Sequence, residues 1–359
     1  MSLNLIFRTF LLTFTFVPLS IYLLLLAPNQ LFTDLVLIGN TTWAQEPRIT
    51  QVFIDRQHPI RELNRFNKYL QHYVAKETSK PFLHLVRDTQ QLIGSIKTRC
   101  RARRLSTHWT WWMHPIPLPR KVIIRKQQRI YYASNPKTGS TSFKMFLYAL
   151  DGSSREELMD INVHEQGEGH YVILDSKKDS YFYSHPQFKK TFPHYLKVGA
   201  IRNPLTRLVS AFRDKQLRKD EFDIDLGDLQ GKDDGAIFTQ FLRELVQEGS
   251  RLQQNIHLKP QWEQMTICSW PYDVLIPFEQ EHDYIELLQD ITRTSGTPYP
   301  GSRRERGLEK HDTVYYTRQY FKQVNQALLE QVYRLYQMDF VLLGYTSLKD
   351  PGFPLLLPG

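Results

Sequence analysis

Strand-like and helix-like patterns of apolar residues alternate along the chain from about residue 121 onward. Residues 121–134, KVIIRKQQRIYYAS, are rich in β-branched and aromatic side chains and predict one or two strands. Residues 195–201, YLKVGAI, predict another strand, and residues 339–345, DFVLLGY, predict a closing one. This alternation indicates an α/β fold in which helices flank a mainly parallel sheet.

Apolar positions at helical spacing lie between these strands. Residues 141–152 and 204–216 each place apolar side chains three or four positions apart, which predicts a helix in each segment. Gly152 stands where the first helix should end, and Pro204 stands in the first turn of the second. Residues 313–336 predict one long helix.

An uncharged apolar run near the N-terminus predicts a membrane anchor. Residues 10–27 carry no charge, and Arg8 precedes them. The run is just long enough to span a bilayer, and the positive charge on its short side predicts a cytoplasmic tail at residues 1–9. A cleaved signal peptide is the alternative, since Ala27 offers a small residue for cleavage.

The remainder of the chain is therefore expected to be lumenal. We divide it into a stem and lead-in at residues 28–95, a main folded domain at 96–350 and a C-terminal tail at 351–359. Asn40 begins an Asn-Thr-Thr sequon, which predicts a glycosylation site in the stem.

The charge of the chain indicates what kind of partner it binds, and its cysteine content limits the possible disulfides and metal sites. The chain has 359 residues, a formal net charge of +9 and a sequence pI of about 9.3, a balance that favours polyanionic partners. A lumenal address excludes nucleic acid and favours an acidic glycan. Cys100 and Cys268 are the only cysteines, so either one disulfide or two buried thiols is open. No cysteine or histidine spacing predicts a zinc site.

The turn between the first strands and the first helix has the composition of an anion site. It reads NPKTGSTSFK, residues 135–144, in which Lys137 supplies a charge and Gly139 lets the backbone approach closely. Four residues add hydroxyl groups: Thr138, Ser140, Thr141 and Ser142. The lysine precedes the glycine, unlike the order of an ATPase loop, and the short loop suits one phosphate group. An ordinary turn with a surface lysine is the alternative.

A second strand–turn–helix unit carries a second candidate site for binding phosphate. It reads VGAIRNPLTRLVSAFRDK, residues 198–215. Arg202 stands at the end of the predicted strand, where open α/β sheets bind ligands, and its planar guanidinium suits a terminal phosphate. Ser210 follows about two helical turns later. Two such units predict a nucleotide phosphorylated at two positions.

These two motifs resemble the paired signatures of the Golgi carbohydrate sulfotransferases. The resemblance continues in NIHLKPQWEQMTICSWPYDVLIPFEQ and ends in YRLYQMDFVLLGY, so that it covers residues from about 95 to 346. It implies a sulfotransferase fold with a P-loop-like sheet, and 3′-phosphoadenosine 5′-phosphosulfate (PAPS) as donor. The chain differs from the family pattern at Asn203, Leu258 and Trp270.

The resemblance also implies an acceptor and roles for residues. It is closest to the branch acting on chondroitin, dermatan or related sugars, while the first loop also resembles that of the uronyl 2-O-sulfotransferases. Lys137, with Ser140, would stabilise the leaving oxygen, and Arg202 and Ser210 would hold the 3′-phosphate. No metal is implied.

Several residues are candidates for the general base, the group that would take the proton from the acceptor hydroxyl. His257 is favoured by its motif and His185 by its position between the two phosphate units. Further candidates for the base are His164, His170, Asp273 and Glu279. Two basic clusters are candidates for binding an anionic glycan or the donor phosphates, or are solvated surface: Arg99, Arg101, Arg103 and Arg104 in one, and Arg303, Arg304 and Arg306 in the other.

Two other classes of protein compete with the membrane-anchored sulfotransferase. A lumenal nucleotide-dependent kinase would need magnesium, whereas sulfuryl transfer should not. A glycan-binding protein without catalytic activity would not need to bind the nucleotide. The order of the loop residues speaks against the kinase, and the presence of both Lys137 and Arg202 speaks against the glycan-binding protein.

Overall fold

The computed structural model describes part of the chain. The described residues are 82–105, 119–150, 152, 172–175, 192–217, 222, 233–249, 253–301, 307 and 310–345. The predicted anchor at residues 10–27, Asn40 and the tail at 351–359 lie outside them. No helix in the described part is both long and apolar enough to cross a membrane.

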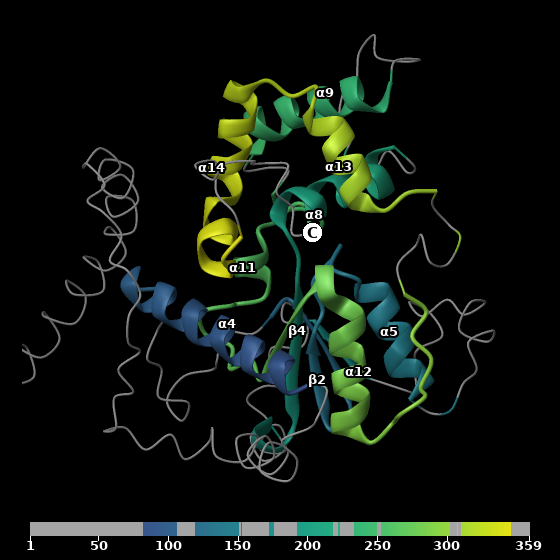
Figure 1. The fold of residues 1–359 in the computed structure, drawn as a ribbon. Coiled ribbons are helices and arrows are strands. Elements are labelled where there is room, and N and C mark those ends of the chain that lie inside the picture. The colour runs from purple at the N-terminus through teal and green to yellow at the C-terminus, as the bar shows by residue number, and fades with distance from the viewer. Residues whose placement is uncertain are drawn as a thin grey trace, which may run out of the picture. The chain divides into compact units, whose positions relative to one another are not determined.

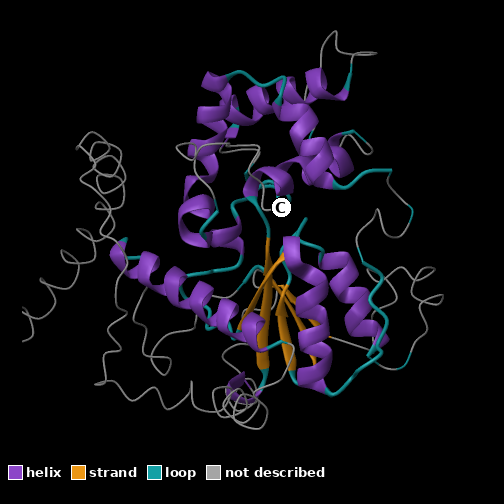
Figure 2. Ribbon diagram, viewed as in Figure 1, coloured by secondary structure: helices purple, strands orange, loops and turns teal. Residues whose placement is uncertain are grey.

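A five-stranded sheet forms the centre of the domain, with strand order β3-β1-β2-β4-β5 (Figures 1 and 2). The strands are β1 (Lys121–Arg125), β2 (Ile130–Ala133), β3 (Val172–Asp175), β4 (Leu196–Ile201) and β5 (Val274–Pro277). Residues 121–134, for which one or two strands were expected, form two, and the strand expected at residues 195–201 is confirmed.

The direction of the strands is parallel where the sheet carries the candidate site. β2, β4 and β5 pair in parallel, whereas β1 is antiparallel to both β2 and β3. Only the four residues 126–129 join β1 to β2, and so short a connection permits a hairpin but no parallel crossover. The expectation of a mainly parallel sheet therefore holds with β1 as the exception.

Alternating side chains of the strands fill two separate cores. On one face, α5 (Ser140–Ala149) and α12 (Glu281–Thr292) cover the sheet, and the ring of Tyr132 stacks on that of Phe143 with centroids 3.9 Å apart. On the other face, Tyr131 packs near Phe192 of the short helix η3 (Phe192–His194). This alternation follows from the two-residue period of a strand.

A long helix covers the free edge of β5. Helix α4 (Leu83–Ala102) places the hydroxyl of Thr89 where it donates to the carbonyl of Leu275, at 3.3 Å, and accepts from the N–H of Leu275, at 2.9 Å. It thereby satisfies two edge groups that would otherwise be open to pairing with another strand. The boundary expected between residues 95 and 96 falls inside this helix.

A disulfide joins α4 to the segment ahead of β5. Cys100 bonds to Cys268, with 5.6 Å between their Cα atoms, and this decides between the two alternatives left open by the sequence. We expect the double replacement Cys100→Ser, Cys268→Ser to lower the free energy of unfolding by about 2–5 kcal/mol, because the bond closes a long loop in the unfolded chain. Thermal unfolding of both proteins with and without a reductant checks this. A reductant should lower the melting temperature of the wild type only, and equal melting temperatures throughout would contradict the expectation.

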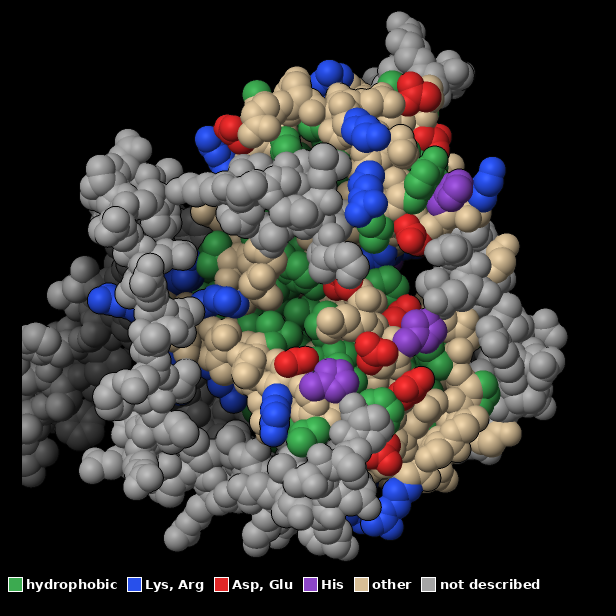
Figure 3. All heavy atoms as spheres, viewed as in Figure 1, with side chains coloured by type: hydrophobic (Ala, Val, Ile, Leu, Met, Phe, Trp, Pro, Cys, Tyr) green, Lys and Arg blue, Asp and Glu red, His purple; other side chains and the backbone are tan. Residues whose placement is uncertain are grey.

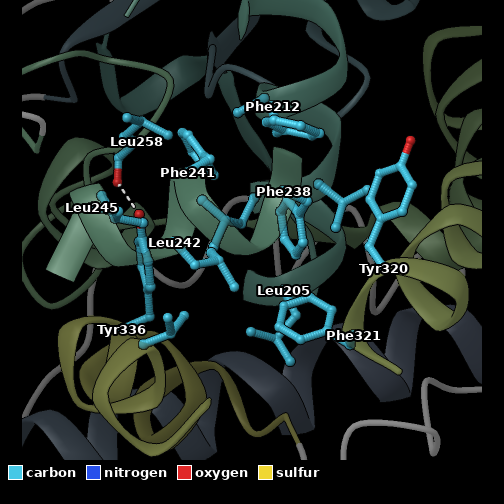
Figure 4. Packing of buried hydrophobic residues seen from close by; sticks show 14 of the residues in the cluster. Leu205, Phe212, Phe238, Phe241, Leu242, Leu245, Leu258, Tyr320, Phe321 and Tyr336 are labelled. Atoms are coloured by element: carbon cyan, nitrogen blue, oxygen red, sulfur yellow. Dashed lines mark hydrogen bonds between the residues drawn. The ribbon is translucent and has the colours of Figure 1, made fainter. Parts of the chain in front are cut away.

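Helices at the carboxyl end of the parallel strands form a second layer around an apolar core of their own (Figures 1 and 4). They are α8 (Pro204–Ala211), the π-helical turn η4 (Phe212–Gln216), α9 (Asp234–Gln247), α13 (Thr313–Phe321) and α14 (Gln326–Leu343). Phe212 packs between Phe238 and Phe241, with each pair of ring centroids 5.1 Å apart. Tyr336 donates to the carbonyl of Leu258 at 2.7 Å. Two short helices, α11 (Gln261–Gln264) and η6 (Phe278–Gln280), lie near the strand ends.

Two expectations about helices and one about a strand need correction or adjustment. The helix expected at residues 204–216 begins at Pro204 but widens into the π-turn after Ala211. The single helix expected at residues 313–336 is two helices, because Asn325 caps α14 by accepting from the N–H of Leu328 at 2.9 Å. The closing strand expected at residues 339–345 is wrong, since α14 continues to Leu343.

Candidate active site

The turn after β2 has a backbone shaped for an anion. Lys137 and Gly139 both adopt left-handed conformations, with φ of 69° and 73°, on either side of Thr138. Turns of this kind point successive N–H groups into one concavity, and the N-terminus of α5 follows directly. The first hydrogen bond of the helix runs from the N–H of Phe143 to the carbonyl of Gly139, so the N–H groups of residues 140–142 have no partner within the helix.

Gly139 is required by packing as well as by its φ angle. A Cβ atom at this position would lie 2.5 Å from the ring of Phe278 and 3.0 Å from a carboxylate oxygen of Glu281. A narrow cleft beside the turn is lined by Thr138, Gly139, Phe278, Glu281 and Tyr299 among others. The turn thus backs onto the end of β5, and its surroundings leave room for backbone only.

The four hydroxyl groups of the turn divide into two pairs. Thr138 is buried and donates to the carbonyl of Asn135 at 2.8 Å, and Ser142 is buried and donates to the carbonyl of Gly301 at 2.6 Å. Ser140 and Thr141 are half-buried in the first turn of α5. Thr138 and Ser142 therefore shape the turn, which leaves Ser140 and Thr141 as the better placed hydroxyls for a ligand.

Lys137 forms an ion pair that its own segment does not indicate. Its ammonium donates to the carboxylate of Asp214, which lies 77 residues further along in η4. π-Helical turns are rare and occur often at functional sites. The sequence singled out Lys137 but not Asp214, because the contact depends on how α8 and η4 pack above the turn.

Arg202 lies beside the same turn, at the end of β4. Its guanidinium donates to the carbonyl of Lys137 at 3.0 Å and stacks over the ring of Phe278, 4.3 Å from the centroid. Asn203 accepts from the N–H of Leu205 at 2.9 Å and so caps α8. The difference from the family pattern at Asn203 is thus a cap of the helix. Ser210 is half-buried on the last turn of α8.

A buried polar network ties the turn to two other segments. Asn135 donates to the side-chain oxygen of Gln261 at 3.0 Å, and the amide nitrogen of Gln261 donates to the carbonyl of Arg202 at 2.7 Å. Asp339 of α14 accepts from the N–H groups of Gln261 and Trp262, at 2.9 and 2.8 Å. Burial raises the pKa of Asp339 to about 6, against the opposing effect of these bonds.

Arg207 crosses the middle of this network. Its buried guanidinium donates to the carbonyls of Pro136, Lys259 and Ile256, at 2.9, 2.9 and 3.2 Å. It therefore fixes the anion turn relative to the segment that carries His257. Sequence reasoning did not single out Arg207, although it lies within the second motif.

His257 lies among the charges of the turn. Burial, together with the positive charges of Lys137, Lys215 and Arg207, lowers the pKa of His257 to about 3, against the opposing effect of Asp214. The backbone N–H of His257 donates to the side chain of Asn255 at 2.9 Å. The imidazole is therefore neutral throughout the neutral and mildly acidic range, and the structure brings it together with Lys137.

This shift makes the stability of the fold sensitive to acid. The unfolded chain protonates His257 at its ordinary pKa of about 6.5, whereas the folded protein does so only near pH 3. The contribution is complete above about pH 6.5 and is lost progressively as the pH falls toward 3. We expect the wild type to lose about 2 kcal/mol more than His257→Gln between about pH 6.5 and pH 4.5.

Urea unfolding at both pH values measures this difference. His282→Gln is the matched control, because it makes the same replacement at an exposed position on α12. Equal pH dependence in the wild type and His257→Gln would contradict the expected shift.

The structure separates the other candidate bases. Glu279 lies in the site, where it accepts from the N–H of Asn203 at 2.8 Å and from the hydroxyl of Tyr345 at 3.2 Å. Asp273 lies at the amino-terminal end of β5, opposite the end that carries the site, and its carboxylate pairs with Lys197 at 3.3 Å. Asp273 is thus too far from the turn to act as its base. His164, His170 and His185 lie outside the described residues.

Of the two basic clusters, one lies within the described residues and the other lies outside them. Arg99, Arg101, Arg103 and Arg104 lie at the C-terminal end of α4 and just beyond it. Arg99 donates to the carbonyl of Leu342 at 3.1 Å, which ties α4 to α14, while the other three are exposed. Arg303, Arg304 and Arg306 lie outside the described residues.

Comparison with known proteins identifies the class to which this fold and site belong. The sulfotransferase family profile matches residues 120–346, and the chain therefore belongs to the sulfotransferase family. The protein is a sulfotransferase, and the resemblance drawn from its motifs is confirmed at this level. Family membership disfavours both the kinase and the glycan-binding protein without catalytic activity.

Similar proteins are named carbohydrate sulfotransferases. Carbohydrate sulfotransferase 14 of Danio rerio is 24% identical over 271 residues, which cover 70% of this chain and 70% of the relative. Carbohydrate sulfotransferase 9 of Homo sapiens is 24% identical over 68% of this chain and 56% of its own length. Carbohydrate sulfotransferase 10 of Xenopus laevis is 26% identical over 65% of this chain and 68% of its own. No solved structure gives a significant match.

Proposed function

We propose that this protein transfers a sulfuryl group from PAPS to a hydroxyl group of a carbohydrate. The observation that carries the proposal is the pairing of Lys137 in a left-handed turn with Arg202 at the end of the neighbouring strand, in a chain of the sulfotransferase family. The names of the relatives favour a carbohydrate acceptor. PAPS supplies a sulfuryl group on a phosphosulfate bond, whose cleavage leaves adenosine 3′,5′-bisphosphate.

The residues of the turn fit the negatively charged end of such a donor. Lys137 supplies the positive charge that stabilises a departing oxygen, and the N–H groups at the start of α5 supply fixed dipoles. Ser140 and Thr141 add hydroxyl donors, since the other two hydroxyls are engaged within the protein. We assign Arg202 and Ser210 to the 3′-phosphate, with Arg202 also holding the carbonyl of Lys137 in place.

His257 is our choice among the described residues for the group that accepts the proton of the acceptor hydroxyl. It is neutral, as a base must be, and it lies among the charges that surround Lys137. An anion bound at the turn would offset those positive charges and raise the pKa of His257 toward the range of an effective base. His185 stays a second prediction.

Compartment and acceptor follow from separate observations. The Cys100–Cys268 disulfide supports an oxidising compartment, which agrees with a protein of the Golgi membrane whose residues 10–27 form a single anchor. With this orientation Asn40 would lie in the lumen, where it can be glycosylated. Acidic side chains gather along α12 on the face shown in Figure 3. A chondroitin- or dermatan-like acceptor, being negatively charged, should therefore approach from elsewhere.

The test is a transfer assay with the full chain purified from a eukaryotic host. Sulfur-labelled PAPS and EDTA would be incubated with chondroitin, desulfated dermatan, heparosan, and oligosaccharides ending in N-acetylgalactosamine or glucuronate. We expect label on one glycan in the presence of EDTA, because no metal is required. Label that appears only when magnesium is restored would contradict the mechanism, and failure to bind adenosine 3′,5′-bisphosphate would contradict the donor site.

A further inference from the structure

Asp214 neutralises the lysine of the anion turn in the donor-free protein. Its carboxylate contacts the ammonium of Lys137, and the two side chains are 23% and 11% exposed. Lys137 comes from the turn after β2, while Asp214 comes from η4 above the sheet. A negatively charged group thus occupies the position next to the cation that a phosphosulfate would need.

The neighbours of Asp214 hold its backbone in place. Phe212 is fully buried in the helical core, and the wide turn is closed by the N–H of Leu217, which donates to the carbonyl of Phe212 at 3.1 Å. Arg213 stacks on the ring of Tyr316, 3.4 Å from its centroid, and donates to the hydroxyl of Tyr320 at 2.6 Å. Asp214 therefore cannot move far from the site, whereas Lys137 has a long flexible side chain.

We propose that Asp214 competes with the donor for Lys137 and thereby sets the affinity of the site for nucleotide. This inference rests on the proposed function, because it concerns the same anion site. A bound anion and the carboxylate repel each other across a partly buried cation, where charges are screened less than at an open surface. Lys137 has three N–H donors, but their attraction is divided when two anions share them.

The competition has a use in the reaction cycle. A site that combines a lysine, an arginine and helix N–H groups would hold a bisphosphate product tightly, and release of product limits many enzymes. Because the carboxylate of Asp214 can form its ion pair with Lys137 again, it favours dissociation of the bisphosphate product. Asp214 is a positioning residue in this scheme, because it acts through Lys137 and not on the transferred group.

The test is calorimetric titration of adenosine 3′,5′-bisphosphate into the full chain. We expect Asp214→Asn, which keeps the shape and a hydrogen-bond acceptor but removes the charge, to lower the Kd by about tenfold. The KM for PAPS should fall in the same proportion. Glu286→Gln removes one negative charge from the exposed side of α12 and is the matched control, with an expected change below about twofold. Asp214→Ala is a second variant that should also bind more tightly.

The Lys137→Met background shows whether the effect passes through Lys137. There, Asp214→Asn should change the Kd by less than about threefold, because the competition for Lys137 is gone and only the direct repulsion between the carboxylate and the anion remains. Unchanged or weaker binding by both Asp214 variants, with melting temperatures like that of the wild type, would overturn the inference. An equal gain of affinity in both backgrounds would also overturn it. If the wild type itself binds no nucleotide, the proposed function fails first, and this result differs from the other two.

Discussion

Replacing Lys137 by methionine is expected to lower kcat by about 10²–10³-fold. The hydrogen bond between the turn and Arg202 would remain, because the carbonyl of Lys137 and not its side chain accepts from Arg202, whereas the ion pair with Asp214 would be lost. What is also lost is the positive charge that Lys137 supplies to the departing oxygen. Steady-state kinetics with saturating PAPS measures the effect.

The control for this variant is Lys322→Met, because Lys322 is exposed beyond the end of α13. It removes the same charge and should leave kcat unchanged within about twofold. If Lys137→Met kept more than about a tenth of the activity, the departing oxygen would have to be stabilised by another group, and the assignment of Lys137 would be wrong.

Replacing Arg207 by methionine is expected to lower the free energy of unfolding by about 3–5 kcal/mol. Arg207 is 2% exposed and its guanidinium donates to three carbonyls. Methionine would remove this donor from the carbonyl of Pro136 and would leave the other two carbonyls only the side-chain amide of Gln264. The negative charge of Asp339 would also lose the cation that attracts it. Urea unfolding measures the difference from the wild type.

Arg318→Met is the matched control for the Arg207 variant, since Arg318 is exposed on α13 and should cost less than about 0.5 kcal/mol. Arg207→Lys keeps the charge but not the three-way geometry of the donors, so it should fall between the other two. Equal stability of Arg207→Met and Arg318→Met would show that the network does not hold the fold.

The elements nearest the site were the most predictable part of the fold. The strands within residues 121–134 and at 195–201 follow from local pattern, whereas the antiparallel pairing of β1 with β2 was not predicted. The turn between strand and helix follows from its glycine and hydroxyls. The C-terminal region was less predictable. Residues 339–345 have the composition of a buried strand, but Val332, Tyr336 and Phe340 continue the helical spacing of α14, and Gly344 ends it.

The candidate site shows a similar division. Lys137 and Arg202 are identified by motif because their role depends on position at the end of a strand. Asp214, Gln261 and Asp339 act through partners far away in sequence, and Asn135 meets Gln261 across 126 residues. Such contacts depend on packing between elements, so neither composition nor periodicity indicates them.

The Cys100–Cys268 bond has a mechanical consequence. If residues 10–27 anchor the protein, tension from the membrane enters the domain through the start of α4. Under such tension the first part of α4 would separate from β5. The covalent bond at Cys100 would then transmit the force to the segment ahead of that strand. Lys137, Arg202 and His257 would then keep their relative positions while force acts on the stem.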